Sequence, residues 1–205
     1  MKVDSTIKRI ILASKSIDRR EILKRAGLLF ETFITNIDEE KFKKEFPKGN
    51  EFVKELAKAK AISAKEKMLG KGFNGLIIAA DTIVELDGEI IGKAKNEEVA
   101  FNILKKLTGR THELITGIAI TEIKSSKIIF DSESTFVEFL ELSDNEIIGY
   151  IKTNEWKGRA GAYSIMGRAS LFIKKIIGSP SNVIGLPMHK LYEILNNDFN
   201  MNLFR

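Results

Sequence analysis

The stretch LIIAADTIVELDGEII, residues 76–91, decides the fold. It opens with a short apolar run, 76–80, of the kind that forms a buried core strand, and this run ends at Asp81-Thr82. Two further apolar runs flank Asp87-Gly88, a dipeptide that strongly favours the two-residue turn of a β-hairpin. The stretch therefore predicts one core strand followed by a hairpin, with polar side chains where the strand ends.

The flanking sequence alternates strands with helices before this stretch, and antiparallel strands dominate after it. Upstream, apolar periodicity and turn residues predict a strand at 9–13, a helix at 17–26, a strand at 30–34, a loop at 36–50 and a helix at 51–69. Downstream they predict a helix at 96–107, strands at 112–123 and 127–140, a helix at 143–152, a strand at 170–177 and a helix at 186–196. This order indicates an α/β protein with a mixed β-sheet. No linker or repeat interrupts it, so we expect residues 1–205 to form a single domain, either one compact unit or two lobes around a cleft.

Composition excludes several chemistries. The chain of 205 residues has no cysteine, which removes disulfides, thiolate catalysis and sulfur-ligated zinc. His112 and His189 are its only histidines, so any metal ion would be held by carboxylate oxygens, which favours Mg²⁺ or Mn²⁺. The 33 Lys and Arg residues exceed the 28 Asp and Glu residues and give a net charge of +5. This charge suits anionic partners such as phosphates, although we expect most of these lysines simply to be solvated.

The sequence contains no membrane signal. No segment approaches the roughly 18 continuous apolar residues of a membrane span. Residues 1–16 carry a basic flank, but their apolar run is too short for a secretion signal. We therefore expect a cytoplasmic protein that does not associate with membranes.

Polar residues gather where the first predicted strand meets the first predicted helix. Ser14, Ser16, Asp18 and Arg19 lie in this turn. Free backbone N–H groups at a helix start suit a phosphate, and an arginine can clamp one with two hydrogen bonds. The ordinary alternative is a capped surface helix. The glycine pattern of a P-loop is missing, so a P-loop is excluded.

Carboxylates and lysines elsewhere could complete such a site. Asp81 follows a buried strand, a usual place for ligand-site residues in α/β sheets, and Asp38-Glu39-Glu40 follows the second strand. Neighbouring carboxylates can bind Mg²⁺, and Lys60 and Lys93 could bring ammonium groups to the same opening. Each has an ordinary alternative: a turn aspartate, a polar loop and solvated lysines. The residues alone therefore predict a basic, carboxylate-containing cleft for a phosphorylated ligand, and they do not define a reaction.

Three further residues have more than one interpretation. His112 lies within an alternating strand pattern, and we expect a structural role for it. Trp156 and Tyr163 could stack on a base, although a half-buried loop aromatic is the commoner outcome.

An ordered set of short motifs resembles a known family. The motifs are LASKSIDRREIL at 12–23, ADTIV at 80–84, Gly92-Lys93, AGAYSIMG at 160–167 and Gly185-Leu186-Pro187. Each is weak alone, but together, in order and at compatible spacing from about residue 10 to 195, they resemble the Maf family of nucleoside triphosphate pyrophosphatases.

The resemblance implies a reaction, a fold and a set of site residues. The reaction is hydrolysis of a nucleotide between its α and β phosphates, with removal of non-standard nucleotides as a possible house-cleaning role. The fold is an elongated mixed β-sheet flanked by helices, with two lobes around a cleft, similar to inosine triphosphatases; homodimers are common in the family. By motif position, the phosphate-contacting set comprises Ser14, Arg19, Lys60 and Lys93. Glu39 and Asp81 match the acidic pair that holds a divalent metal, Mg²⁺ or Mn²⁺, and Asp81 stands where the family has its proton acceptor.

Positions that select the base depart from the family pattern. The usual Ser-Pro-Arg-Arg is Ser16-Ile17-Asp18-Arg19 here, so Asp18 replaces the first arginine. Thr82 matches members that prefer dTTP and UTP, but Met166 stands where those members have glutamine. The subgroup that hydrolyses 7-methyl-GTP is matched at neither of its two positions. The pyrimidine preference is therefore not carried over. Because an ionised Asp18 accepts hydrogen bonds and cannot donate them, our hypothesis is that it disfavours the carbonyl edge of uracil or thymine.

Two other functional classes compete with the enzyme. A nucleotide-binding regulator of cell division would need no turnover, but it would have no need for both Glu39 and Asp81, and their joint presence favours an enzyme. A nucleic-acid-binding module is disfavoured because the basic residues are scattered and no recognised motif interleaves them with aromatics. We therefore expect a nucleoside triphosphate as the partner, and no nucleic acid.

Overall fold

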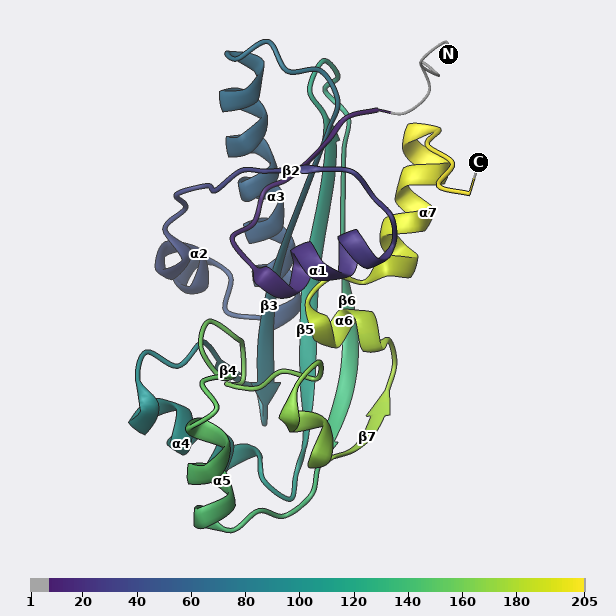
Figure 1. Cartoon of the computed structure of the whole chain (residues 1–205). Coiled ribbons are helices and arrows are strands. Elements are labelled where there is room, and N and C mark those ends of the chain that lie inside the picture. Colours follow the sequence, from purple (N-terminus) through teal and green to yellow (C-terminus); the bar gives the residue numbers. More distant parts are fainter. Residues whose placement is uncertain (1–7, 205) are drawn as a thin grey trace.

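Three long antiparallel strands form the centre of the molecule: β3 (Leu76–Leu86), β5 (Thr111–Glu122) and β6 (Ile128–Phe139). In the computed structural model, which describes residues 8–204, they run through almost the full height of the chain (Figure 1). The shorter strands are β1 (Ile10–Leu12), β2 (Glu31–Thr32), β4 (Glu89–Ile91) and β7 (Ile173–Ile177). The order is β2-β1-β3-β5-β6-β7, with β4 beside β3; β1 is parallel to β2 and β3, and the other pairs are antiparallel. The mixed α/β sheet predicted from the sequence is confirmed.

The helices divide between the two ends of these strands. They are α1 (Ile17–Arg25), α2 (Glu39–Glu45), α3 (Gly49–Leu69), α4 (Glu97–Leu107), α5 (Asp144–Ile151), α6 (Pro180–Ile184) and α7 (Met188–Phe199), with a 3₁₀ turn at Arg168–Leu171. At one end α3 covers one face of the sheet, and α1 and α7 cover the other (Figure 1). We call this end the α3 lobe. At the other end α4 and α5 enclose a separate apolar core, and we call this end the α5 lobe.

Side chains alternate along β3 and separate the two faces of the sheet. Ile77 and Ala79 pack in the cluster beneath α3, whereas Ile78 and Ala80 pack in the cluster with α1 and α7. This is the two-residue period of any β-strand. Continued for two residues, the period places the side chains of Asp81 and Thr82 on opposite faces.

The sequence pattern placed the end of this strand at Asp81-Thr82, but the structure continues the strand through both residues to Leu86. The polar residues do not interrupt pairing, because the backbone of Asp81 faces Gly117 of β5 and that of Thr82 faces Thr116. Both side chains also find polar partners: Asp81 accepts from Lys60, and Thr82 contacts Thr116 at 2.9 Å. Because the backbone and the polar side chains are all hydrogen-bonded, the strand continues through these two residues.

A second prediction was wrong at residues 36–50, which were expected to form a loop. This segment contains α2 and the start of α3. The Asp38 side chain accepts from the backbone N–H of Lys41 at 3.2 Å and caps α2. The helix has no buried residue, so it leaves no apolar periodicity in the sequence.

Helix α3 lies unusually close to β5. A Cβ atom on Gly117 would lie 2.1 Å from the carbonyl oxygen of Val53, so only glycine fits beneath this helix. Gly117 is also the residue that faces Asp81 across the β3–β5 pair. The close approach therefore brings α3, which carries Lys60, directly over the middle of β3.

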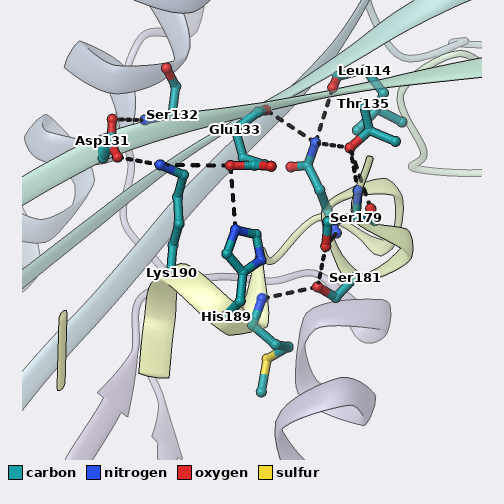
Figure 2. Close-up of polar contacts among 11 residues, drawn as sticks. Leu114, Asp131, Ser132, Glu133, Thr135, Ser179, Ser181, His189 and Lys190 are labelled. Atoms are coloured by element: carbon teal, nitrogen blue, oxygen red, sulfur yellow. Dashed lines mark hydrogen bonds and ion pairs between the residues drawn. The ribbon is translucent and has the colours of Figure 1, made fainter. Parts of the chain in front are cut away.

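A buried amide fixes α6 against the long strands. Asn182 is fully buried, and its Nδ2 donates to the carbonyl oxygens of Leu114 and Glu133, both at 3.1 Å, and to the hydroxyl of Thr135 at 3.0 Å. Figure 2 labels these three partners. This anchor holds the C-terminal end of α6, where Gly185 adopts a left-handed conformation with φ of 105°.

Two sequence expectations concern the membrane and the chain start. Within residues 8–204, no helix is both long and apolar enough to cross a bilayer. The first seven residues of the stretch compared above with a secretion signal lie outside the described residues.

Candidate active site

The site lies at a gap along one edge of β3. On this edge β1 pairs with residues 76–78 and β4 pairs with residues 84–86, while β5 occupies the opposite edge. Between them no described strand covers β3, and Asp81 lies in this gap. The neighbouring strand also changes here from parallel to antiparallel. Such a change of strand neighbour leaves a crevice in which open α/β sheets bind ligands.

A lysine joins the two predicted carboxylates. The Nζ of Lys60 donates to Oδ1 of Asp81 at 2.6 Å and to Oε1 of Glu39 at 2.8 Å. Lys60 comes from α3, Asp81 from β3 and Glu39 from the first turn of α2. The Asp81 side chain is 5% exposed and that of Glu39 is 45% exposed. One carboxylate is therefore held at the floor of the site, and the other at its solvent-facing rim.

The positive charges around Glu39 stabilise its ionised form. Burial acts to raise the pKa of this carboxyl, but the charge and hydrogen bond of Lys60 outweigh burial, with help from Lys93 and Lys15. The pKa of Glu39 consequently lies below its ordinary value.

Lys93 reaches the same opening from the other side. It follows Gly92 just after β4, and its backbone forms a β-bridge with Ala160. The residue as a whole is exposed, but its ammonium group is desolvated within the cleft; this lowers the pKa of Lys93, and the charges of Asp81 and Glu39 only partly oppose the effect. Ser14, Lys60, Asp81 and Lys93 line one cleft together with Glu39, and we call this space the outer cleft.

Arg19 is buried and is bound mainly by the protein itself. Its Nε donates to the carbonyl oxygen of Gly185 at 2.6 Å, and its Nη2 donates to the hydroxyl of Thr82 at 2.7 Å. Its Nη1 donates to the carbonyl oxygen of Ala80 at 2.9 Å and to the hydroxyl of Ser14 at 3.2 Å. Four of the five N–H donors of a guanidinium are thus used internally. The resemblance implied a phosphate contact for Arg19; the structure gives it the additional role of joining α1, β3 and the end of α6.

The predicted specificity residues lie around a second, smaller space. Thr82, Asp18 and Met166 line this space, which we call the inner pocket. It adjoins the outer cleft, and Asp18 and Lys93 border both. The structure therefore brings all nine predicted site residues to two connected spaces on either side of the β3 edge.

Sequence reasoning missed one residue, Arg159. Its guanidinium forms two hydrogen bonds with the Asp18 carboxylate, and it borders both the outer cleft and the inner pocket. The only signal in the sequence was a basic residue immediately before the motif at 160–167. The two aromatics considered for base stacking are buried: Trp156 donates to the carbonyl oxygen of Ile151 at 3.1 Å, and the hydroxyl of Tyr163 contacts His112 at 3.0 Å.

The carboxylates fit a divalent metal ion that is shared with a ligand. No group of three or more metal-ligating side chains occurs within the described residues 8–204. Mg²⁺ seldom needs such a group, because it commonly binds through one or two carboxylates together with substrate phosphates. Glu39 and Asp81 each use one oxygen on Lys60, which leaves each a second carboxylate oxygen for a metal.

The fold and the site together define a class of protein: one that binds a phosphorylated ligand in a basic cleft, against a pair of carboxylates at the edge of a mixed sheet. Comparison with known sequences narrows this class. Residues 9–198 match the Maf-like protein family, and the chain belongs to this family.

Similar proteins cover nearly the whole chain. The dTTP/UTP pyrophosphatase of Alkaliphilus oremlandii is 45% identical over 197 residues, covering 96% of this chain and all of the relative. A dTTP/UTP pyrophosphatase of Clostridium botulinum is 42% identical over 189 residues, covering 91% of this chain and 97% of the relative. Among solved structures, the Ham1 protein of Staphylococcus aureus is 20% identical, with a TM-score of 0.38 over 65% of this chain and 73% of that chain.

Proposed function

We propose that this protein is a nucleoside triphosphate pyrophosphatase that takes dTTP and UTP and releases the nucleoside monophosphate and pyrophosphate. The observation that carries the proposal is the contact of one lysine, Lys60, with both Glu39 and Asp81 in a cleft that Lys93 also lines. The close relatives named dTTP/UTP pyrophosphatase support the reaction and the pyrimidine substrates. Nucleoside triphosphates are cytoplasmic metabolites, so we place its action there.

Different residues of the outer cleft make different interactions with the triphosphate. Lys93 and Lys60 supply positive charge, and the hydroxyl of Ser14 supplies a hydrogen-bond donor. A divalent metal bound by Glu39 and Asp81 would neutralise further phosphate charge. Electrostatic stabilisation of this kind provides most of the rate in phosphoryl transfer.

In this proposal Asp81 is the group that activates water. It lies at the floor of the cleft, and its hydrogen bond to Lys60 fixes the orientation of its carboxylate. Asp81 orients a water molecule and accepts its proton while the water oxygen attacks the α-phosphorus. The bond between the α-phosphorus and the bridging oxygen breaks, and pyrophosphate leaves with the bonding electron pair.

The test is product analysis with a matched pair of variants. Asp81→Asn keeps the side-chain shape and removes the proton acceptor, so we expect kcat to fall by at least about 100-fold. Asp87→Asn makes the same chemical change at the exposed hairpin turn, where asparagine also fits, and should retain full activity. Purified protein is incubated with Mg²⁺ or Mn²⁺ and a panel of standard, methylated and deaminated triphosphates.

The products decide between the functional classes. Monophosphate and pyrophosphate, lost in Asp81→Asn and retained in Asp87→Asn, support the proposal. A diphosphate with inorganic phosphate would indicate cleavage at the other anhydride bond. Nucleotide binding with no turnover would instead support a regulatory protein.

A further inference from the structure

An ion pair joins two distant parts of the chain at the boundary of the inner pocket. The Nε of Arg159 donates to Oδ2 of Asp18 at 2.7 Å, and its Nη2 donates to Oδ1 at 2.8 Å. The two residues are 141 positions apart in the sequence. Asp18 lies in the first turn of α1, and its carboxylate is therefore paired with a cation before any ligand arrives.

The backbone around Arg159 is held in place as well. The following residue, Ala160, pairs with Lys93, and the N–H of Gly161 donates to the carbonyl oxygen of Gly92 at 3.4 Å. Within its own segment, Nη1 of Arg159 donates to the carbonyl oxygen of Glu155 at 2.6 Å. The guanidinium is thus held by two groups and the backbone that follows it by a β-bridge, although the Arg159 side chain is still 25% exposed.

The guanidinium keeps donors for a ligand. Of its five N–H groups, three donate to Asp18 and Glu155, which leaves one on Nη1 and one on Nη2. An arginine carries no acceptor, so these groups can bind only acceptor atoms such as carbonyl oxygens. Because two of its donors are already held by a carboxylate, little side-chain entropy is lost when the others bind.

Arg159 lies at the boundary between the outer cleft and the inner pocket, which differ in their lining residues. The outer cleft beyond it contains Lys60, Glu39 and Asp81, which suit phosphates and a metal. The inner pocket behind it shares the charged residues at the boundary, but Met166, Ile165 and the hydroxyl-bearing Thr82 line it alone and supply surface for an uncharged planar ring. With the triphosphate in the outer cleft, the base is the part of the nucleotide that enters the inner pocket.

Building on the proposed function, we propose that Arg159 is a specificity-determining residue that donates to the 4-carbonyl oxygen of uracil or thymine, and that Asp18 is its positioning residue. The 2-carbonyl lies beside the sugar, whereas the 4-carbonyl lies at the opposite, accessible edge of the ring. A carboxylate alone at Asp18 would repel the carbonyl oxygen of a base. Paired with Arg159, it instead orients a guanidinium that donates a hydrogen bond to that oxygen. This account replaces our hypothesis that Asp18 disfavours uracil and thymine.

The test compares UTP with CTP, because these substrates differ only at the edge that Arg159 is proposed to contact. CTP carries an amino group in place of the 4-carbonyl and gives Arg159 no acceptor there. We expect the ratio of kcat/KM for UTP to that for CTP to fall about 10- to 100-fold in Arg159→Ala, as for a lost hydrogen bond to a charged group. Arg168→Ala is the matched control, an exposed arginine outside both spaces, and should leave the ratio unchanged.

Asp18 is tested through its effect on Arg159. Asp18→Asn weakens the hold on the guanidinium and should lower the same ratio, mainly through a higher KM for UTP, with kcat little changed. In an Arg159→Ala background, Asp18→Asn should cause no further loss in the ratio. Asp18→Glu keeps the negative charge, so this variant should retain more of the preference for UTP over CTP than Asp18→Asn does. Melting temperatures of all variants identify any that fail to fold.

The outcomes distinguish failure of this inference from failure of the proposed function. If the unaltered protein hydrolyses no triphosphate, the proposed function is wrong. If it is active and Arg159→Ala lowers kcat/KM equally for UTP and CTP, then Arg159 binds phosphate or sugar and the inference is wrong. A folded and active Arg159→Ala with an unchanged ratio and unchanged kcat/KM would also overturn it.

Discussion

Lys60 shows how one residue can hold two carboxylates of the candidate site together. Without a cation between them, Glu39 and the buried Asp81 would repel each other, and Asp81 would be a buried charge with no partner. Leaving such a charge unpaired costs several kcal/mol, roughly 3–5 in measured cases. Lys60 therefore contributes to the stability of the folded site, in addition to its proposed role in binding phosphate.

Lys93 gives the site a predicted pH dependence. Its pKa lies below the ordinary lysine value, because desolvation of its ammonium group in the cleft opposes the charged form more than Asp81 and Glu39 support it. As the pH rises, Lys93 should lose its charge earlier than a surface lysine would, and the triphosphate should bind more weakly. We expect KM to rise on the alkaline side, measured as KM against pH for UTP.

Lys93→Arg checks this assignment, because an arginine stays protonated in proteins. The rise in KM should move to higher pH in this variant, with a smaller change in kcat. An identical alkaline rise in both proteins would show that a different group titrates.

The predictions made from single residues succeeded where the chemistry was local. His112 was expected to be structural, and it is buried against Tyr163 with its pKa lowered by burial to about 4, so it is neutral near pH 7. Arg159 could not be predicted, because its significance depends on Asp18, which lies on a distant helix. The sequence shows that Asp18 replaces an arginine of the family motif. It does not show that a different arginine, Arg159, pairs with Asp18 in the fold.

At the scale of elements, the packing of α3 on β5 leads to a stability prediction. Gly117→Ala places a methyl group against the backbone of α3 at Val53, which cannot move like a side chain. We expect the free energy of unfolding to fall by about 3 kcal/mol, as for overpacked cores, measured by urea denaturation. Activity should fall too, because α3 carries Lys60 and Gly117 faces Asp81.

Gly149→Ala is the control for this change. Gly149 lies in α5 and has no atom within 4 Å of the position that its Cβ would occupy. Alanine is a better helix residue than glycine, so this variant should be more stable by about 0.5–1 kcal/mol. Equal effects of the two substitutions would contradict the close approach of α3.

Elements were predictable where burial left a pattern. The long strands β5 and β6 follow the expected ranges closely, and the Ser143–Glu146 capping box at the start of α5 is confirmed. Helix α2 was missed because none of its residues is buried, so only the Asp38 cap marks where it starts. The break expected in β3 was wrong because Asp81-Thr82 resembles a turn in the sequence. Their hydrogen-bond partners, Lys60 and Thr116, are visible only in the fold.

For the whole molecule, the three shared strands predict a single cooperative unfolding transition. Each lobe contains its own core, but β3, β5 and β6 extend through both, so neither core can lose its strands without the other. Trp156 is the only tryptophan and lies in the core of the α5 lobe, whereas far-UV circular dichroism reports on the whole chain. The two signals should give coincident urea curves.

Two separate transitions would show that the lobes unfold independently and would contradict a single domain. Light scattering on the same samples gives the molar mass and tests the homodimer, which stays a prediction.

The adjacent side chains of Asp81 and Thr82 point to opposite faces of one strand, and this has a consequence for how the protein can change. In the proposed function, hydrolysis takes place on the face that carries Asp81, and the base is recognised on the face that carries Thr82. Substitutions at Asp18 or Met166 alter the recognition face without touching the acidic pair or its lysine. A lineage with this architecture can therefore exchange one nucleobase for another while its hydrolytic machinery is inherited intact.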